Sequence, residues 1–149
     1  MPIYKIDERV IHWFRRVADP LARLGLFIVY FWFGALKVFG ASPATPLVQS
    51  LFEHTISFMQ FETFIVLFGL FEMLIGVLFI FKGYERIVMP LLLLHMITTA
   101  MPLFVIPEAT WSGFLVPTLE GQYIVKNIML IAAATGIAAH LHPLHKREG

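Results

Sequence analysis

Three charged residues lie within stretches that are otherwise apolar enough to cross a membrane. Glu72 is near the middle of the segment Phe61–Phe81, Lys37 is near the end of the first apolar stretch, and Lys126 is near the start of the last. A charge at mid-membrane depth costs on the order of 3 kcal/mol unless it is paired or neutralised. We therefore expect both lysines to lie within reach of Glu72, directly or through one water. The alternative is that both lysine side chains extend to the outer membrane interface.

These residue types offer binding and proton transfer. Ammonium groups hold carbonyl or anionic oxygens, and a buried carboxyl accepts or relays a proton. We predict an outer-facing polar pocket within the membrane that binds a small anionic or lipid-soluble molecule, with a quinone as one candidate. The predicted ligand-binding residues are Lys37, Glu72, Lys126, Asn127, Tyr123 and Trp111.

The histidines leave two interpretations open. His95 stands alone among leucines, where a histidine either completes the hydrogen bonds of a helix bundle or handles protons. With Glu72 it is the candidate for proton transfer, and no reaction is assigned. The tail holds His140, His142 and His145, but nothing supplies a fourth metal ligand at a fixed spacing. We predict a solvated tail and no metal site.

The composition places the chain in the membrane class. Hydrophobic residues make up 58% of its 149 residues and charged residues only 14%, and a soluble domain of this size has too little interior to bury so much apolar sequence. The net charge of +1 comes without a basic cluster, which argues against nucleic acid as a partner. Cysteine is absent, which excludes disulfides and paired-thiol chemistry.

The apolar periodicity predicts an all-α domain over residues 1–149. Its four transmembrane helices, expected to form one bundle, cover about residues 21–39, 61–81, 87–106 and 123–141. An amphipathic helix at the membrane surface precedes them, and a short interfacial helix lies between the first two spans. Gly69, Glu72 and Gly76 share one helical face, where glycines let a neighbouring helix approach closely.

The basic residues predict the orientation. One set of segments carries Lys5, Arg9, Arg15, Arg16, Arg23, Lys82, Arg86, Lys146 and Arg147. The two remaining loops hold no Lys or Arg and contain Glu53, Glu62, Glu108 and Glu120. With four spans, all basic segments fall on one side, so the positive-inside rule places both termini in the cytoplasm.

Three motifs together resemble a known family. FWFGALKVFG (Phe31–Gly40), GLFEMLIG (Gly69–Gly76) and PTLEGQYIVKN (Pro117–Asn127) are similar to the DoxX-like membrane proteins, most of all to the YkgB-type reactive-chlorine-resistance branch. The resemblance implies a four-helix bundle in the bacterial cytoplasmic membrane and a link to redox or oxidative-stress physiology. One member type is a subunit of a thiosulfate:quinone oxidoreductase. It also implies polar core positions at Lys37, Glu72, Lys126 and Asn127.

Three functions remain open at this stage. The first is an accessory redox or stress-defence protein that binds membrane lipid and a small molecule; no cofactor is evident beyond a quinone or lipid. The second is a proton-coupled transporter that acts as a dimer and exchanges protons through Glu72 and His95. The third is a structural subunit with no site of its own. A homo-oligomer or a redox partner subunit is a possible partner, and electron transfer in the first function would need such a partner or the quinone itself.

The absence of native cysteine makes the orientation testable by labelling. Ser42→Cys and Ser112→Cys should react with an impermeant maleimide added to intact cells, whereas Gly83→Cys should not, because the positive-inside rule places its turn in the cytoplasm. The reverse labelling pattern would overturn the orientation and move the pocket to the cytoplasmic side.

Overall fold

The computed structural model describes residues 3–141, and most of them are helical. The longer helices are α1 (Ile3–Val38), α2 (Thr45–Thr55), α3 (Phe61–Ile80), α4 (Glu85–Ala100), α7 (Leu119–Lys126) and α8 (Ile128–Ala138). Two short helices, α5 (Pro102–Val105) and α6 (Pro107–Thr110), precede a hairpin of β1 (Trp111–Gly113) and β2 (Val116–Pro117).

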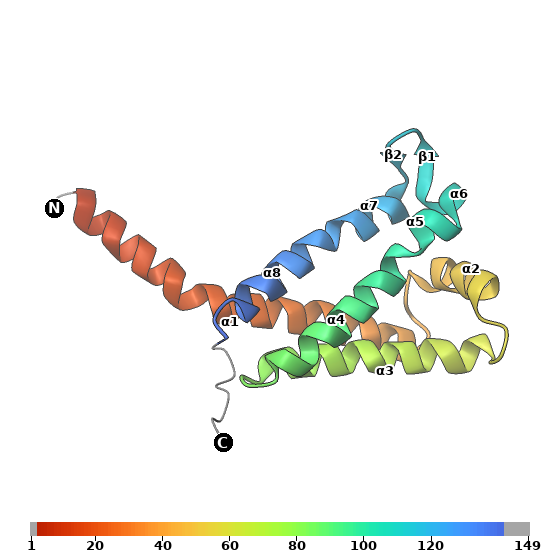
Figure 1. Ribbon diagram of the computed structural model, residues 1–149, viewed down its shortest axis with the longest axis horizontal. Coiled ribbons are helices and arrows are strands. Elements are labelled where there is room, and N and C mark those ends of the chain that lie inside the picture. Colours follow the sequence, from red (N-terminus) through yellow and green to blue (C-terminus); the bar gives the residue numbers. More distant parts are fainter. Residues whose placement is uncertain (1–2, 142–149) are drawn as a thin grey trace, which may run out of the picture.

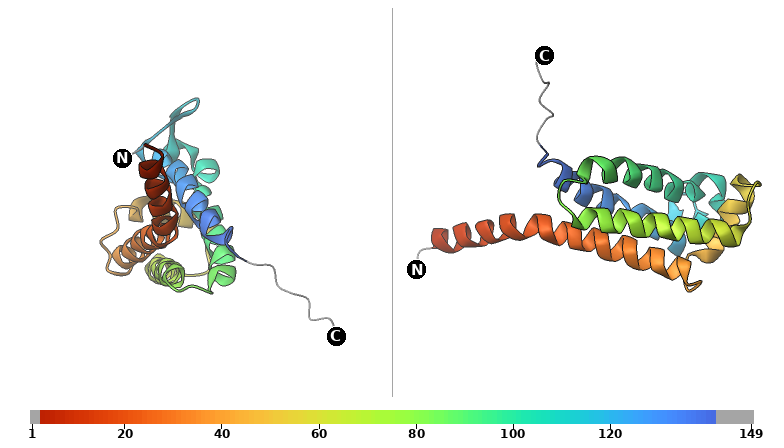
Figure 2. Two further views of the ribbon diagram at one scale, coloured as in Figure 1. Left: turned by 90° about the vertical axis from the view of Figure 1, so that its left-hand side faces the viewer. Right: turned by 90° about the horizontal axis from the view of Figure 1, so that it is seen from below.

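The long helices lie side by side as a bundle (Figures 1 and 2). At one end, which we call the loop end, α2, α5, α6 and the hairpin cover the bundle. At the other, the turn end, lie the α3–α4 turn and the end of α8, and the N-terminal part of α1 projects beyond it as an arm. The chain therefore runs up and down between two distinct ends.

Three helical segments among the described residues are long and apolar enough to cross a membrane. They are Ile6–Val38, Phe61–Ile80 and Glu85–Val105. The predicted fourth span is divided, because α7 ends at Lys126 and α8 begins at Ile128 with 11 residues. Asn127 itself keeps right-handed helical backbone angles, φ −60° and ψ −17°, so Leu119 to Ala138 continue as 20 residues that reach about 30 Å at 1.5 Å per residue, close to the thickness of the hydrocarbon core. The fourth crossing stays a prediction.

The break occurs at Asn127. Its backbone amide bonds to the carbonyl of Ile124, three residues back, at 3.1 Å, which tightens the turn locally. Asparagine favours helix ends because its side chain competes for backbone hydrogen bonds. The helix also begins earlier than expected, at Leu119 rather than Tyr123, where the Thr118 hydroxyl accepts from the amide of Gly121 at 3.2 Å.

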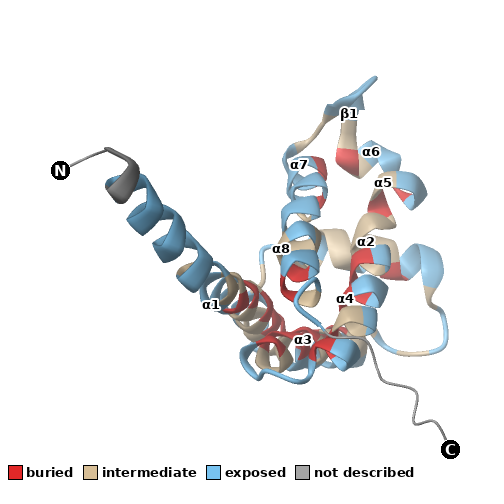
Figure 3. Ribbon diagram, turned by 60° about the vertical axis from the view of Figure 1, so that its left-hand side comes forward, coloured by how far each residue is buried: buried red, intermediate tan, exposed pale blue. Residues whose placement is uncertain are grey.

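The surface helix and the first span, predicted as separate, are one helix. α1 runs for 36 residues with Pro20 inside it. Proline removes one backbone hydrogen bond, but the helix continues through it to Val38. Figure 3 shows that the arm is exposed, and its apolar side chains include Trp13 and Phe14. That this arm lies on the membrane surface stays a prediction.

The predicted helix between the first two spans is present as α2. Its one fully buried residue, Phe52, packs its ring against Phe61 and Phe64 of α3, with centroids 5.5 and 4.9 Å away. The segment predicted as a loop over residues 107–122 also contains regular structure, namely α6, the hairpin and the start of α7. Both segments help to cover the loop end of the bundle.

Glycines allow the close packing of α1 on α3. A Cβ atom added at Gly34 would lie 2.5 Å from the carbonyl oxygen of Gly69, and one at Gly69 would lie 2.6 Å from that of Gly34. One at Gly76 would lie 2.8 Å from the backbone nitrogen of Phe31. The predicted glycine face of α3 is therefore the contact with α1. The core beside it comprises Leu26, Tyr30, Ile75, Phe79, Val88, Leu92, Met96, Ala134 and Ile137.

Gly34→Ala should push α1 away from α3 and destabilise the protein by about 1–3 kcal/mol, the usual cost of overpacking. Gly25→Ala is the matched control in the same helix, because a Cβ there meets nothing within 4 Å. It should be neutral or stabilise by about 0.5–1 kcal/mol. Thermal unfolding in detergent, followed by circular dichroism, measures both. Equal midpoints for the two variants would contradict the close contact.

Candidate functional site

A buried ion pair joins α1 to α3. The Nζ atom of Lys37 lies 2.6 Å from Oε2 of Glu72, and the two residues are 6% and 5% exposed. Gly34 and Gly69 stand one turn before the pair on their helices, so the glycine contact brings the two backbones close enough for it. The prediction that Lys37 answers the charge of Glu72 is confirmed in geometry.

His95 of α4 extends this pair into a chain. Its Nε2 atom lies 2.9 Å from the second carboxylate oxygen of Glu72, and its Nδ1 atom lies 3.2 Å from the hydroxyl of Tyr30. The ring stacks on Phe68, with centroids 5.2 Å apart. We call Lys37, Glu72, His95 and Tyr30 the polar chain; it connects α1, α3 and α4 inside the bundle.

The hydrogen bonds assign the proton on His95. Glu72 only accepts, so Nε2 carries the hydrogen in the neutral ring, and Nδ1 is the acceptor. The Thr99 hydroxyl, 3.3 Å from Nδ1, donates to the backbone carbonyl of His95 instead. The Tyr30 hydroxyl is then the donor to Nδ1. Among the described residues, no buried side-chain nitrogen or oxygen lacks a partner.

This arrangement has room for one more proton. The charges of Lys37 and Glu72 offset one another, and the lone pair on Nδ1 of His95 is the position at which an imidazole accepts a second proton. A doubly protonated ring would stay beside the Glu72 carboxylate and would donate to Tyr30 or Thr99 after a hydroxyl rotation. The polar chain can therefore store a proton without breaking its ion pair.

Lys126 does not join this chain. Its side chain is exposed, and Nζ lies 5.3 Å from the ring centroid of Tyr123, which is itself 62% exposed. The predicted approach of Lys126 to Glu72 is wrong, because the end of α7 turns both side chains outward, where the ammonium group contacts the tyrosine ring. Trp111 is also elsewhere: its Nε1 donates to the carbonyl of Leu103 at 3.1 Å.

An apolar groove lies beside the polar chain. It runs between α4–α5 and α7–α8, with a cavity volume of about 250 Å³. It is lined by Met96, Ala100, Leu103, Phe104, Ile124, Val125, Asn127, Ile128 and Ile131. Met96 and Ala100 follow His95 and Thr99 directly in the chain, so groove and polar chain use adjacent faces of α4. Of the predicted ligand-binding residues, Asn127 alone lines it.

A second hollow of similar size lies on α1. Its cavity volume is about 270 Å³, and it is lined by Phe27, Ile28, Phe31, Trp32 and Ala35. Neither hollow is lined by a charged residue among those described. Neither hollow is therefore the predicted charged pocket. Lys37 and Glu72 pair with each other inside the bundle and line neither of them.

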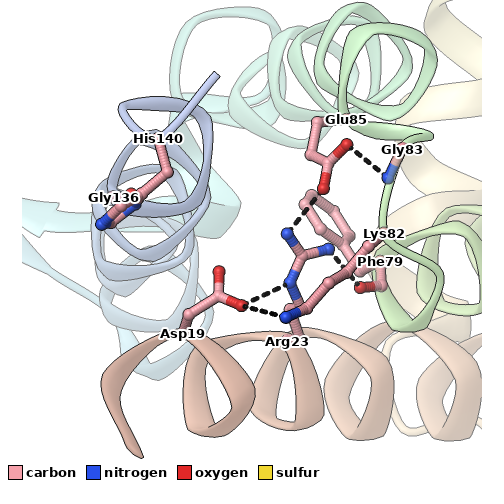
Figure 4. A network of polar contacts seen from close by, with 8 residues as sticks. All are labelled: Asp19, Arg23, Phe79, Lys82, Gly83, Glu85, Gly136 and His140. Carbon is pink, nitrogen blue, oxygen red and sulfur yellow. Dashed lines mark hydrogen bonds and ion pairs between the residues drawn. The ribbon is translucent and has the colours of Figure 1, made fainter. Parts of the chain in front are cut away.

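A second ionic cluster lies at the turn end (Figure 4). The guanidinium of Arg23 donates to Asp19 at 2.9 Å, to Glu85 at 2.6 Å and to the carbonyl oxygen of Phe79 at 3.2 Å. Glu85 also accepts from the amide of Gly83 at 2.7 Å. Arg23 thus binds the last turn of α3 and the first turn of α4 together, because Phe79 offers one of the unpaired end carbonyls.

The sequence analysis placed Arg23 only among the basic residues outside the membrane, although its helical position indicated that it faces the bundle. Arg23 shares a helical face with Tyr30, Gly34 and Lys37, which face the bundle. His140, at the end of α8, donates from Nδ1 to the carbonyl of Gly136 at 2.9 Å. His142 and His145 lie outside the described residues.

Fold and site define the class: a helical protein with three segments suited to cross a membrane and a buried polar chain between them. No protein-family model matches the chain, and neither a curated protein nor a solved structure is significantly similar to it. The likeness to DoxX-like proteins therefore depends on the quoted motifs alone.

Removing Glu72 alone should lower the free energy of unfolding more than removing both members of the ion pair. Glu72→Leu leaves Lys37 buried and unpaired, with an expected loss of about 3–5 kcal/mol. Lys37→Met should cost less, because Glu72 keeps His95, and Lys37→Met with Glu72→Leu should recover part of the loss. Thermal unfolding in detergent measures the three variants.

Lys126→Met is the control for that series. It removes an exposed lysine, so its effect should stay within about 0.5 kcal/mol. A double variant that loses as much as the sum of the two single ones would show that the two groups do not interact.

Proposed function

We propose that the protein is a small integral membrane protein that binds a lipid-soluble molecule in the groove between α4–α5 and α7–α8, beside a polar chain that takes up and releases a proton. The observation that carries the proposal is the contact set of His95. It lies 2.9 Å from Glu72 on one side and 3.2 Å from the Tyr30 hydroxyl on the other. A histidine held between a carboxylate and a hydroxyl is a proton-transfer arrangement.

The groove favours a neutral, lipid-soluble ligand over an anion. No cation lines it among the described residues, and Glu72 already neutralises Lys37. The amide of Asn127 both donates and accepts hydrogen bonds, so it suits a carbonyl or hydroxyl group on an otherwise apolar molecule. A quinone carries such carbonyl groups on an otherwise apolar molecule. Its reduction consumes protons, which the neighbouring polar chain would supply.

The wider setting follows the resemblance and the charge pattern. We place the protein in the bacterial cytoplasmic membrane, with α7–α8 as the fourth crossing, both termini in the cytoplasm and an accessory part in redox or oxidative-stress defence. The exposed apolar side of the α1 arm fits the membrane surface. Electrons would pass through the bound quinone or a partner subunit.

A proton-coupled transporter that acts as a dimer is the second candidate. The direct contact of Glu72 with His95 favours it, because two adjacent groups that titrate can exchange a proton. A rise in the pH of the liposome lumen when substrate is added outside, lost in Glu72→Gln, would support proton exchange. A stable partner that co-purifies, with no ligand binding by the isolated chain, would instead favour a structural subunit.

Groove binding is testable with the native tryptophans. Trp13→Phe with Trp32→Phe leaves Trp111, whose indole bonds to Leu103 in the groove wall. In lipid nanodiscs, decylubiquinone should quench this tryptophan saturably. Ala100→Leu fills the groove and should weaken the affinity by about tenfold or more, equivalent to about 1.4 kcal/mol.

Ala35→Leu is the matched control, since Ala35 is a half-buried alanine that lines the other hollow, on α1. It should leave quenching unchanged. Non-saturable quenching that is equal in all variants would reflect quinone dissolved in lipid and would exclude the groove as its site.

A further inference from the structure

The hairpin at the loop end presents an apolar tip. β1 and β2 pair antiparallel, and the two tip residues, Phe114 and Leu115, are 92% and 73% exposed. Figure 1 and the end-on view of Figure 2 show the hairpin projecting sideways from the bundle rather than along its axis. The tip therefore faces the medium around the bundle at the level of the loop end.

The base of the hairpin is held firmly. The Thr118 hydroxyl donates to the carbonyl of Ala109 at 2.8 Å, and the Thr118 amide donates to that of Thr110 at 2.9 Å. Thr110 is fully buried, and a Cβ atom added at Gly121 would clash with its carbonyl oxygen. Together with the indole bond of Trp111, these contacts fix the direction in which the tip points.

The residue types at the tip are unusual for a turn in water. Leu115 has a φ of +56°, a left-handed conformation that costs a leucine roughly 1–2 kcal/mol and that glycine or asparagine adopts readily. A leucine here exposes apolar surface in a strained position. This arrangement is favourable only where an apolar surrounding receives the side chain.

We propose that the hairpin tip inserts into the boundary between lipid headgroups and acyl chains at the loop end, which the positive-inside rule makes the outer leaflet. Residues 109–119 carry no charged side chain. Phe104, which follows the Leu103 that accepts from the Trp111 indole, and Leu119, which follows β2, are 81% and 61% exposed. Trp111 at its base is of the type enriched at membrane interfaces. The open backbone groups of the turn place it at the interface rather than in the hydrocarbon core.

A second copy of the chain fits the tip less well. A stable interface buries about 800 Å² per partner. Phe114 buries at most about 250 Å², and Leu115 offers a smaller side chain. The tip alone therefore falls short of what a stable association between copies needs. The inference requires only that the chain spans the membrane and is independent of the groove ligand.

Spin labelling measures the depth of the tip in the full-length protein. Phe114→Cys carries a nitroxide in vesicles of phosphatidylcholine and phosphatidylglycerol, and power saturation compares collisions with oxygen and with a water-soluble nickel chelate. Leu67→Cys, half-exposed on α3, is the lipid reference, and Glu8→Cys on the arm is the aqueous reference. The oxygen-to-nickel ratio at residue 114 should exceed that of the aqueous reference severalfold and approach the lipid value.

A polar tip supplies the second measurement. Phe114→Ser with Leu115→Asn keeps the turn conformation, since asparagine tolerates a positive φ, and a label at Val116→Cys reports the depth. This label should give a lipid-like ratio beside the native tip and a water-like ratio beside the polar one. Three outcomes would each overturn the proposal. The first is an aqueous ratio at residue 114, and the second is an unchanged ratio beside the polar tip. The third is spin–spin broadening that vanishes upon dilution with unlabelled protein, which would favour a second copy of the chain. If Leu67 reads as lipid while residue 114 reads as water, the span stands and the hairpin proposal alone fails.

Discussion

The ion pair of Lys37 with Glu72 is the interaction on which the rest of the structure depends. A carboxylate and an ammonium group only 2.6 Å apart, both almost fully buried, stabilise a helix pair only when the backbones approach closely and the remaining lone pairs are satisfied. The glycine contact meets the first condition, and His95 meets the second by binding the other oxygen of Glu72. The buried carboxylate of Glu72 thus accounts for two features of the bundle. It requires glycines where α1 meets α3, and it requires the His95 ring from α4.

One face of α1 organises both ends of the bundle. Arg23 holds the α3–α4 turn at one end, and Lys37 holds the middle of α3 toward the other, with Tyr30 between them on the bond to His95. The α3–α4 pair is therefore attached to α1 at three depths by polar contacts that tolerate no shift in register. Apolar contacts between helices in a membrane discriminate poorly between helix registers, because the lipid tails are as apolar as the side chains. Our hypothesis is that these contacts mainly select one alignment of the helices.

The sequence predicted the parts of this arrangement that depend on local periodicity. Gly69 and Glu72 on one face of α3, and a lysine needed to answer the glutamate, were both visible in the spacing. The continuity of α1 through Pro20 and the break at Asn127 were not, because each depends on how neighbouring turns share hydrogen bonds. Lys126 was assigned to the site on charge alone, but the direction in which a side chain leaves its helix decides what it reaches. Arg23 was missed because its partner Glu85 lies 62 residues away.

The polar chain and the groove lie on two adjacent faces of α4. His95 and Thr99 face the charges, whereas Met96 and Ala100 face the groove, so an apolar ligand need not enter the charged interior to lie near a proton carrier. This separation explains why the buried charges need no ligand to be satisfied. It also limits the proposed chemistry: a ligand in the groove would meet a proton through the half-buried Thr99 hydroxyl or an intervening water rather than through Glu72 itself. In the proposed function, Glu72 holds His95 in the tautomer whose Nδ1 accepts a hydrogen bond from the Tyr30 hydroxyl.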